Sequence, residues 1–175
     1  MIYPNIPIVG IEPAVKPAVT YKPGGQVLVM ATPMTIREEK FRTLMGRYSK
    51  QAKIIPLPCP GLMDFVERGD LYSEDFRKYL EELLYEYRTN KIDAAVLGCT
   101  HYPFLRDVIE RVVAGREVLI IDSGEAVEKR VESLLDENDL RSDATLTPQY
   151  EFLTFADEEY RRRLEQKART IVGSR

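Results

Sequence analysis

The chain is constrained most by a regular alternation of short apolar runs with longer stretches whose apolar residues recur at helical spacing. The apolar runs at 26–32, 53–58, 94–98 and 118–121 predict strands. The run at 26–32 is apolar at nearly every position, as in strands that are covered on both faces. Each of the four runs is followed by a helical pattern. Strands that alternate with helices build a mainly parallel sheet with helices on both faces. We therefore predict an α/β protein with three αβα layers.

The helical stretches carry recognisable starts. Apolar positions from Phe41 to Tyr48 mark one face of a helix, and Thr-Ile-Arg-Glu at 35–38 fits a capping box before it. Ser73 has the character of an N-cap and predicts the start of a longer helix. We expect two more strands at 6–10 and 150–155, where short apolar runs occur.

Composition argues against several classes of partner and location. The net charge is −3 and the basic residues form no stripe, so the sequence gives no sign of a nucleic-acid partner. No apolar run approaches the roughly 20 residues that span a bilayer, and the first residues lack the features of a signal peptide. Two cysteines are too few for a disulfide framework. We expect a cytoplasmic enzyme with reduced thiols and no membrane partner.

Residues with reactive side chains gather after one of the predicted strands. In sheets of this kind, ligands bind beyond the carboxyl ends of the strands. The strand at 94–98 is followed by Cys99, Thr100 and His101, and Pro103 then opens the next helix. A neighbouring imidazolium and a helix N-terminus both lower the pKa of a thiol. The amides at that helix start could also hold a substrate carboxylate.

Two simpler interpretations of the same residues stay open at this stage. A cysteine at a strand end is often a small buried hydrophobe, and a single histidine near a turn is often a cap or packing residue. Cys99, His101, Cys59 and Glu67 could also supply a zinc site. Their spacing lacks the usual Cys-x-x-Cys or His-x-x-x-His pattern, and the sequence holds no second histidine. The combination of thiol, hydroxyl, histidine and helix start favours a catalytic cysteine.

The segment Leu-Gly-Cys-Thr-His-Tyr-Pro at 97–103 resembles the second cysteine motif of glutamate racemases, within the aspartate/glutamate racemase superfamily. The histidine two residues after the cysteine favours glutamate racemase, because aspartate racemases usually carry a glutamate there. The resemblance covers nearly the whole chain through four further segments, at 8–14, 31–36, 59–67 and 121–124.

The resemblance implies cofactor-independent racemisation, in which a proton leaves the α-carbon of glutamate and another returns to the opposite face. Two thiols flank the substrate, one acting as base and the other as acid. The resemblance makes Cys99 one of them, with His101 polarising it or shuttling its proton and Glu67 supporting the histidine. It also implies that three threonines contact the substrate carboxylate: Thr100, Thr32 and Thr35. We expect no cofactor and no metal.

The sequence departs from the family in its first part. It lacks an Asp-Ser-Gly with trailing glycines near the start, and it lacks the Ala-Cys-Asn-Thr that supplies the first thiol. Cys59 matches the family's Cys-Pro and not that motif, so we expect it to be a packing residue. The resemblance divides the chain into a middle, flavodoxin-like lobe at 1–115 and the C-terminal segment of an incomplete second lobe at 116–175. The apolar residues at 127–135 would need to be covered by the rest of this chain or by a second subunit, and we expect a homodimer or an absent N-terminal lobe as the partner.

Three functions follow as alternatives. The first is a glutamate racemase, an isomerase that supplies D-glutamate for peptidoglycan and cell-wall synthesis, and this chain alone is expected not to racemise at a useful rate. The second is a non-catalytic binding remnant of the same fold. The third is a zinc-dependent hydrolase. Activity restored by an N-terminal fragment would single out the first, and stoichiometric zinc would single out the third.

Overall fold

A four-stranded parallel sheet forms the centre of the fold. The computed structural model describes residues 6–88, 91–113, 117–142 and 149–172. The sheet has the strand order β2–β1–β3–β4, and every neighbouring pair is parallel. Its members are β1 (Gln26–Ala31), β2 (Lys53–Pro58), β3 (Ala94–Leu97) and β4 (Leu119–Ile121). The predicted α/β fold is therefore confirmed.

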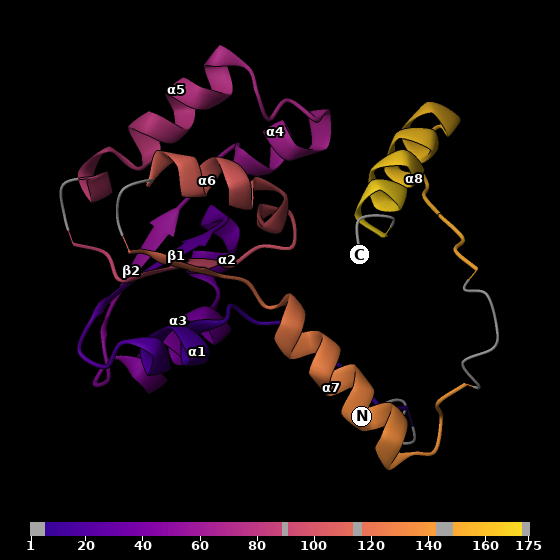
Figure 1. Cartoon of the computed structure of the whole chain (residues 1–175), viewed down its shortest axis with the longest axis horizontal. Helices are drawn as coiled ribbons and strands as arrows, with labels where there is room; N and C mark the ends of the chain where they lie inside the picture. The colour runs from indigo at the N-terminus through magenta and orange to yellow at the C-terminus, as the bar shows by residue number, and fades with distance from the viewer. Residues whose placement is uncertain (1–5, 89–90, 114–116, 143–148, 173–175) are drawn as a thin grey trace. The chain divides into compact units, whose positions relative to one another are not determined.

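Helices cover both faces of the sheet, as Figure 1 shows. One face packs against α1 (Val15–Tyr21) and α3 (Glu39–Tyr48). The opposite face packs against α4 (Leu62–Arg68), α5 (Glu74–Leu83) and α6 (Arg106–Val112). This arrangement gives the three layers that the alternation of strands and helices predicts.

The central strand β1 contributes to both cores, because successive side chains of a strand point to opposite faces. Leu28 and Met30 join the core beneath α5 and α6. Val27 and Val29 join the core beneath α1 and α3. All four side chains are buried, as expected for a central parallel strand covered on both faces.

Two of the expected strands are not present. Residues 6–10 and 150–155 form neither helix nor strand, and neither segment pairs with a strand among the described residues. Their apolar side chains are largely exposed, and Ile8 is exposed by 70%. A strand exists only where its backbone groups pair with a neighbour, so the prediction of strands from these apolar runs was wrong.

The later part of the chain holds two long helices, α7 (Gly124–Glu137) and α8 (Glu158–Val172). The chain forms two compact units, Met1–Asn138 and Asp139–Arg175, so α7 belongs to the first and α8 to the second. None of the α7 residues is buried. The predicted boundary near residue 115 concerns the two lobes of the racemase family and stays a prediction.

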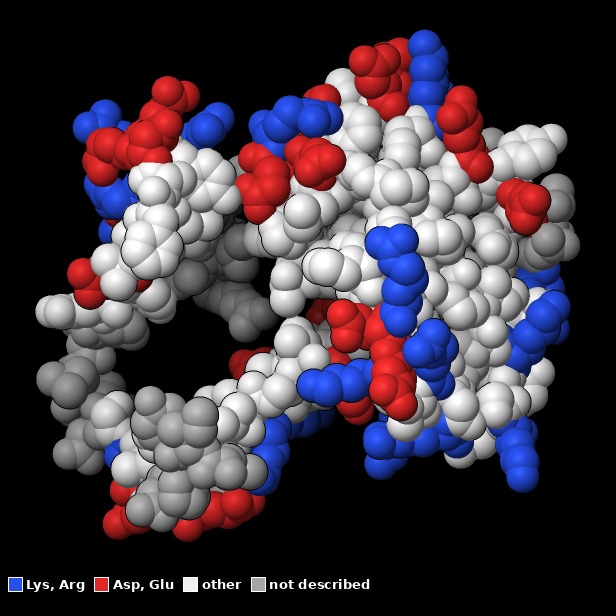
Figure 2. Space-filling view, turned by 180° about the vertical axis from the view of Figure 1, so that it is seen from behind, with Lys and Arg blue, Asp and Glu red and all other residues white. Residues whose placement is uncertain are grey.

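The surface mixes charges of both signs. Acidic and basic side chains stand close to one another on the face that Figure 2 presents. On α8, Arg161 pairs with Glu158 and Glu165 one turn to either side, a spacing that supports an exposed helix. Across the described ranges, every helix is too short or too polar to traverse a lipid bilayer.

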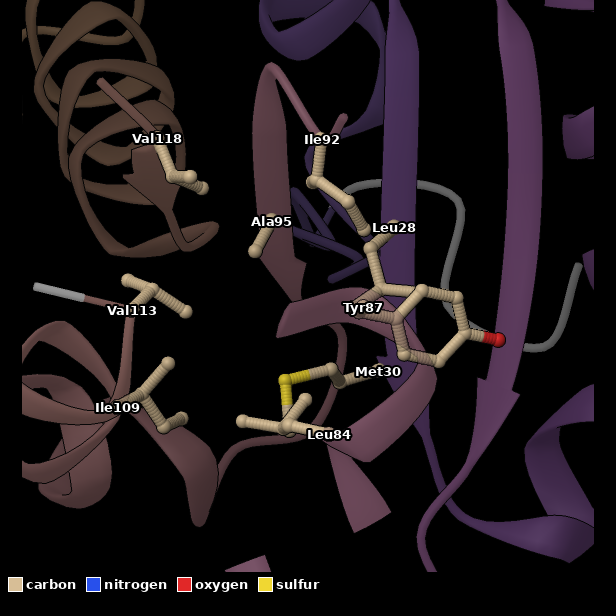
Figure 3. A pocket seen from close by; sticks show the side chains of 9 residues that line it. All are labelled: Leu28, Met30, Leu84, Tyr87, Ile92, Ala95, Ile109, Val113 and Val118. Carbon is tan, nitrogen blue, oxygen red and sulfur yellow. The ribbon is translucent and has the colours of Figure 1, made fainter. Parts of the chain in front are cut away.

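A small cavity lies between the sheet and the layer of α5 and α6 (Figure 3). Its volume is about 20 Å³. Its lining residues are apolar apart from Tyr87, whose hydroxyl points away from the other lining side chains, and they include Leu28 and Met30 from β1. A site for an amino acid needs convergent polar groups and far more space, so this cavity is a packing defect and not a candidate site.

Candidate active site

The carboxyl edge of the sheet gathers most of the predicted site residues. β1 and β3 are neighbours, with Met30 paired to Leu97, so both strands end at the same edge. From β1 the chain proceeds to β2 on one side, and from β3 it proceeds to β4 on the other. A crevice at such a switch point is where open α/β sheets bind ligands. Thr32 directly follows β1, and Cys99 lies two residues beyond the end of β3.

Three of the predicted residues form a continuous chain of contacts. Sγ of Cys99 lies 3.9 Å from Nδ1 of His101, and Nε2 of the same ring lies 2.5 Å from Oε1 of Glu67. Glu67 comes from the last turn of α4, 34 residues earlier in the sequence. The His101 and Glu67 side chains are partly exposed. A carboxylate that orients an imidazole facing a thiol can activate that thiol for proton transfer.

The loop after β3 is tighter than the sequence indicated. We predicted that Pro103 opens a helix, and a helical turn does begin there. It is a 3-10 turn, η2 (Tyr102–Leu105), and the α-helix α6 starts only at Arg106. We expected the first backbone amides of an α-helix at Pro103, where they could hold a substrate carboxylate. A single 3-10 turn occupies that position instead.

Tyr102 anchors this loop to the core of the protein. Its side chain is fully buried, and its hydroxyl donates a hydrogen bond of 3.4 Å to the carbonyl oxygen of Cys59. Burial raises the pKa of Tyr102 above its ordinary value, and the nearby thiols act in the same direction. Tyr102 therefore stays a neutral anchor between the loops that follow β2 and β3.

Gly98 brings the loop close to β1. Its N–H donates a hydrogen bond of 2.8 Å to the carbonyl oxygen of Met30. A β-carbon on Gly98 would lie 2.7 Å from that oxygen and 3.3 Å from Cγ of Pro13. Only glycine fits this approach without moving backbone, and the loop with Cys99 begins at the next residue.

We expect Gly98→Ala to lower the free energy of unfolding by about 2 kcal/mol, because overpacking against backbone typically costs about 1–3 kcal/mol. Urea unfolding checks this. Gly46→Ala in α3 is the matched control, since no atom lies within 4 Å of the β-carbon that this substitution adds; it should raise stability slightly, as alanine favours helices. Equal unfolding midpoints for the two variants would contradict the expectation.

The threonines after β1 differ from the predicted capping box. The hydroxyl of Thr32, not of Thr35, caps a helix, because Thr32 Oγ1 accepts the Thr35 N–H at 3.1 Å. That helix is the short α2 (Pro33–Arg37), and α3 begins at Glu39 without a side-chain cap. The box at 35–38 was wrong because Pro33 starts a helix earlier.

The same two threonines also contact each other directly. Their hydroxyl oxygens lie 2.9 Å apart, and both side chains are partly buried. Thr100 is exposed, in the turn between Cys99 and His101. The structure thus places these three threonines at the ends of two neighbouring strands. Their predicted contacts with a substrate stay predictions.

Cys59 occupies a different environment from Cys99. Its side chain is only 2% exposed, and its thiol donates a hydrogen bond of 3.3 Å to the carbonyl oxygen of Leu57. Burial raises the pKa of the Cys59 thiol to about 12. This thiol resists ionisation and is packed inward, as a structural cysteine would be.

The four residues considered as zinc ligands do not form a metal site among the described residues. Within the described ranges, no three or more histidine, cysteine, aspartate or glutamate side chains gather closely enough to hold a metal ion. Cys59 faces the core while Cys99 faces His101, so the four residues considered for zinc do not converge.

Sequence reasoning did not single out Arg106, and it noted Asp122 only as part of the segment at 121–124 that resembles the family. The Arg106 guanidinium donates to Oδ2 of Asp122 at 2.7 Å, at the edge of the sheet where β4 ends. An arginine near the start of a helix is usually solvated, so nothing in the sequence pattern marks this one. The Asp-Ser-Gly at 122–124 was visible as a strand end, but its partner was not.

Comparison with known proteins finds relatives among the glutamate racemases. No family model matches the sequence. A glutamate racemase of Clostridium perfringens is 47% identical over 142 residues, which cover 81% of this chain and 54% of the relative. A glutamate racemase of Clostridium acetobutylicum is 44% identical over 138 residues, covering 79% of this chain and 53% of the relative.

Solved structures agree with these relatives. The crystal structure of a glutamate racemase from Bacillus anthracis matches with a TM-score of 0.73 at 25% identity, covering 90% of this chain and 57% of that one. A glutamate racemase from Francisella tularensis, in complex with D-glutamate, matches with a TM-score of 0.62 at 28% identity, covering 76% and 49%. The chain spans about half the length of the curated relatives it matches. It is therefore a homologue of the glutamate racemases that corresponds to about half of their length.

Proposed function

We propose that this chain supplies one side of a glutamate racemase active site, in which Cys99 exchanges a proton with the α-carbon of glutamate. The observation that carries the proposal is the Cys99–His101–Glu67 chain of contacts at the carboxyl edge of the sheet. The 47% identity to a glutamate racemase supports glutamate as the substrate. A solved relative holds D-glutamate, and we transfer that ligand to this site.

In the proposed reaction, the α-C–H bond breaks and an S–H bond forms on Cys99. His101 takes up the thiol proton beforehand, because its Nδ1 faces Sγ, and Glu67 steadies the ring through Nε2. The separation of 3.9 Å is long for a proton transfer, but such contacts often tighten when substrate binds. Thr100, Thr32 and Thr35 would hold the substrate carboxylates. On this face of the α-carbon, the thiol of Cys99 and the imidazole of His101 would carry out the proton transfer.

A second thiol must return a proton to the opposite face of the α-carbon. The sequence has two cysteines, and Cys59 is buried with its thiol directed at a backbone carbonyl. The second thiol would therefore come from a polypeptide segment outside this sequence. The same outside segment, or a second subunit, would also cover the apolar side chains of α7, none of which is buried. The product, D-glutamate, would enter peptidoglycan synthesis in the cytoplasm.

The test is a hybrid protein, in which this chain replaces the matched part of the Clostridium perfringens glutamate racemase. We expect the hybrid to racemise L-glutamate, followed by circular dichroism, at no less than about a tenth of the parent's kcat/KM. The parent enzyme and its unmatched half alone are the controls. A hybrid that unfolds cooperatively and binds D-glutamate without turnover would show a binding remnant instead.

Replacing His101 with asparagine in the hybrid should lower kcat/KM by about 100-fold or more, because a positioned general acid–base typically contributes about 10²–10⁴-fold. Glu67→Gln should act in the same direction with a smaller loss, since it leaves the imidazole in place. Asp64→Asn, on the exposed side of the same helix α4, is the matched control. Activity of His101→Asn within about threefold of the unsubstituted hybrid would rule out this role.

A further inference from the structure

Arg106, the first residue of α6, ties the loop that carries Cys99 to the end of β4. Its guanidinium donates two hydrogen bonds of 2.7 Å, one from Nη1 to the carbonyl oxygen of Ile120 and one from Nη2 to Oδ2 of Asp122. A guanidinium is planar and rigid, so two such bonds fix its orientation as well as its position. The start of α6 is thereby held against the last strand of the sheet.

Asp122 is itself held from two sides. Besides the bond from Arg106, its Oδ1 accepts the backbone N–H of Gly124 at 2.7 Å. Partial burial would raise the pKa of Asp122, but the bonds from Arg106 and Gly124, together with the arginine charge, hold that pKa below its usual value. The carboxylate is therefore charged at neutral pH, and it keeps the turn at 122–124 attached to α6.

The same turn also reaches the other end of the Cys99 loop. Ser123 Oγ donates a hydrogen bond of 2.6 Å to the carbonyl oxygen of Glu12. The next residue, Pro13, lies so close to Gly98 that a β-carbon there would come within 3.3 Å of its ring. The turn at 122–124 therefore bonds to Arg106, which directly follows segment 99–105, and to the backbone of Glu12, whose neighbour Pro13 lies beside Gly98.

We propose that Arg106 is a positioning residue that sets the separation between Cys99 and His101 through its bonds to Ile120 and Asp122. The inference rests on the proposed function of Cys99, and it adds a residue that lies outside the Cys99–His101–Glu67 chain. Cys99 and His101, whose Sγ and Nδ1 lie 3.9 Å apart, are only two residues apart in the sequence. The loop that holds them leads into α6, and Arg106 fixes the start of that helix. A shift of the start of α6 moves His101 relative to Cys99.

The experiment measures the rate of Cys99 alkylation by iodoacetamide as a function of pH, in the full chain carrying Cys59→Ala. Around Cys99 the titratable groups are His101 and Glu67 at the site, together with Tyr102 and Cys59. His101, Glu67 and Tyr102 remain in the test protein, and every Arg106, Asp122 and Arg111 variant carries the same Cys59→Ala, so the loss of Cys59 is common to all of them. The test variants are Arg106→Gln, Arg106→Lys and Asp122→Asn. Arg111→Gln, exposed on the same helix, is the matched control.

We expect Arg106→Gln to change the midpoint or the high-pH plateau of the alkylation profile, with a rate change of at least about threefold at pH 7. Arg106→Lys should give a smaller change, because an ammonium cannot serve both acceptors in the same fixed geometry. The double variant that combines Arg106→Gln with Asp122→Asn should have the same alkylation profile as Arg106→Gln alone. Arg111→Gln should have the same profile as the chain that carries only Cys59→Ala. A purely structural arginine would alter the unfolding midpoint and leave the pH profile of the folded protein unchanged.

One further variant separates the two proposals. If His101→Asn shifts the profile while the folded variants Arg106→Gln and Arg106→Lys do not, Arg106 has no positioning role and the proposed function of Cys99 stands. If His101→Asn also leaves the profile unchanged, the coupling between histidine and thiol fails, and the proposed function fails with it. Should Arg106→Gln not fold, the alkylation profiles of Arg106→Lys and Asp122→Asn test the proposal instead, and each should change in the same direction as expected for Arg106→Gln, by a smaller amount.

Discussion

Replacing Cys99 with alanine in the hybrid racemase is expected to lower kcat/KM for both enantiomers of glutamate by about 10³-fold or more. A proton-transfer group contributes about 10²–10⁴-fold, and here the group that meets the α-carbon on one face would be lost entirely. Both directions of the reaction pass through both thiols, one as acid and one as base. Loss of one thiol must therefore slow both directions equally.

The matched control for this prediction is Cys59→Ala, which removes the other thiol of the chain. Cys59 is buried and directed at the Leu57 carbonyl, so its loss should cost some stability and leave turnover within about threefold of the hybrid. Initial rates from each enantiomer, followed by circular dichroism, provide the measurement. If Cys59→Ala abolished turnover and Cys99→Ala did not, the assignment of the two cysteines would be reversed.

The two thiols of the native chain should also differ in alkylation rate at pH 8 by at least about 100-fold. A pKa of about 12 leaves about one Cys59 thiol in 10⁴ ionised at that pH. Its side chain is also almost inaccessible, whereas Cys99 is partly exposed. Iodoacetamide should therefore modify Cys99 long before Cys59, and peptide mass spectrometry after timed quenching resolves the two sites.

Unfolding the chain in concentrated urea is the control for alkylation, because it removes the burial that raises the pKa of Cys59. Both cysteines should then react at similar rates. Raising the pH of the native protein toward 12 should also increase the Cys59 rate about tenfold per pH unit, as long as the fold persists. Equal rates in the native chain at pH 8 would show that Cys59 is not protected as described.

The sequence predicted those parts of the fold that depend on local pattern. The bounds of β2 (Lys53–Pro58) agree with the predicted run, and Ser73 caps α5 by accepting the Phe76 N–H at 3.1 Å. Each of these two sequence signals lies within a segment of only a few residues. A short apolar run, or a hydroxyl at an N-cap, can be recognised without knowledge of the rest of the chain.

The parts that failed depend on distant partners. Residues 6–10 and 150–155 are as apolar as real strands, but no strand pairs with them among the described residues. The position of Thr32 as cap of α2 depended on Pro33 starting a helix earlier than the pattern suggested. Arg106 and Asp122 lie 16 residues apart, and only the sheet brings them together.

The candidate site falls between these cases. The motif at 97–103 is clear in the sequence, and the resemblance by itself links His101 to Glu67. The structure places Glu67 against His101 across 34 residues, a contact that spacing alone does not predict. It also distinguishes the two cysteines by burial, which their sequence surroundings only suggested.

The most direct test of the central claim, that Cys99 serves one face of the α-carbon, is proton exchange in D2O. The purified chain is incubated separately with L- and D-glutamate, and the α-proton signal and the optical rotation are followed together. The account predicts loss of the α-proton from one enantiomer only, with configuration retained, and no loss in Cys99→Ala. Exchange that persists in Cys99→Ala, or inversion of both enantiomers by the chain alone, would contradict it.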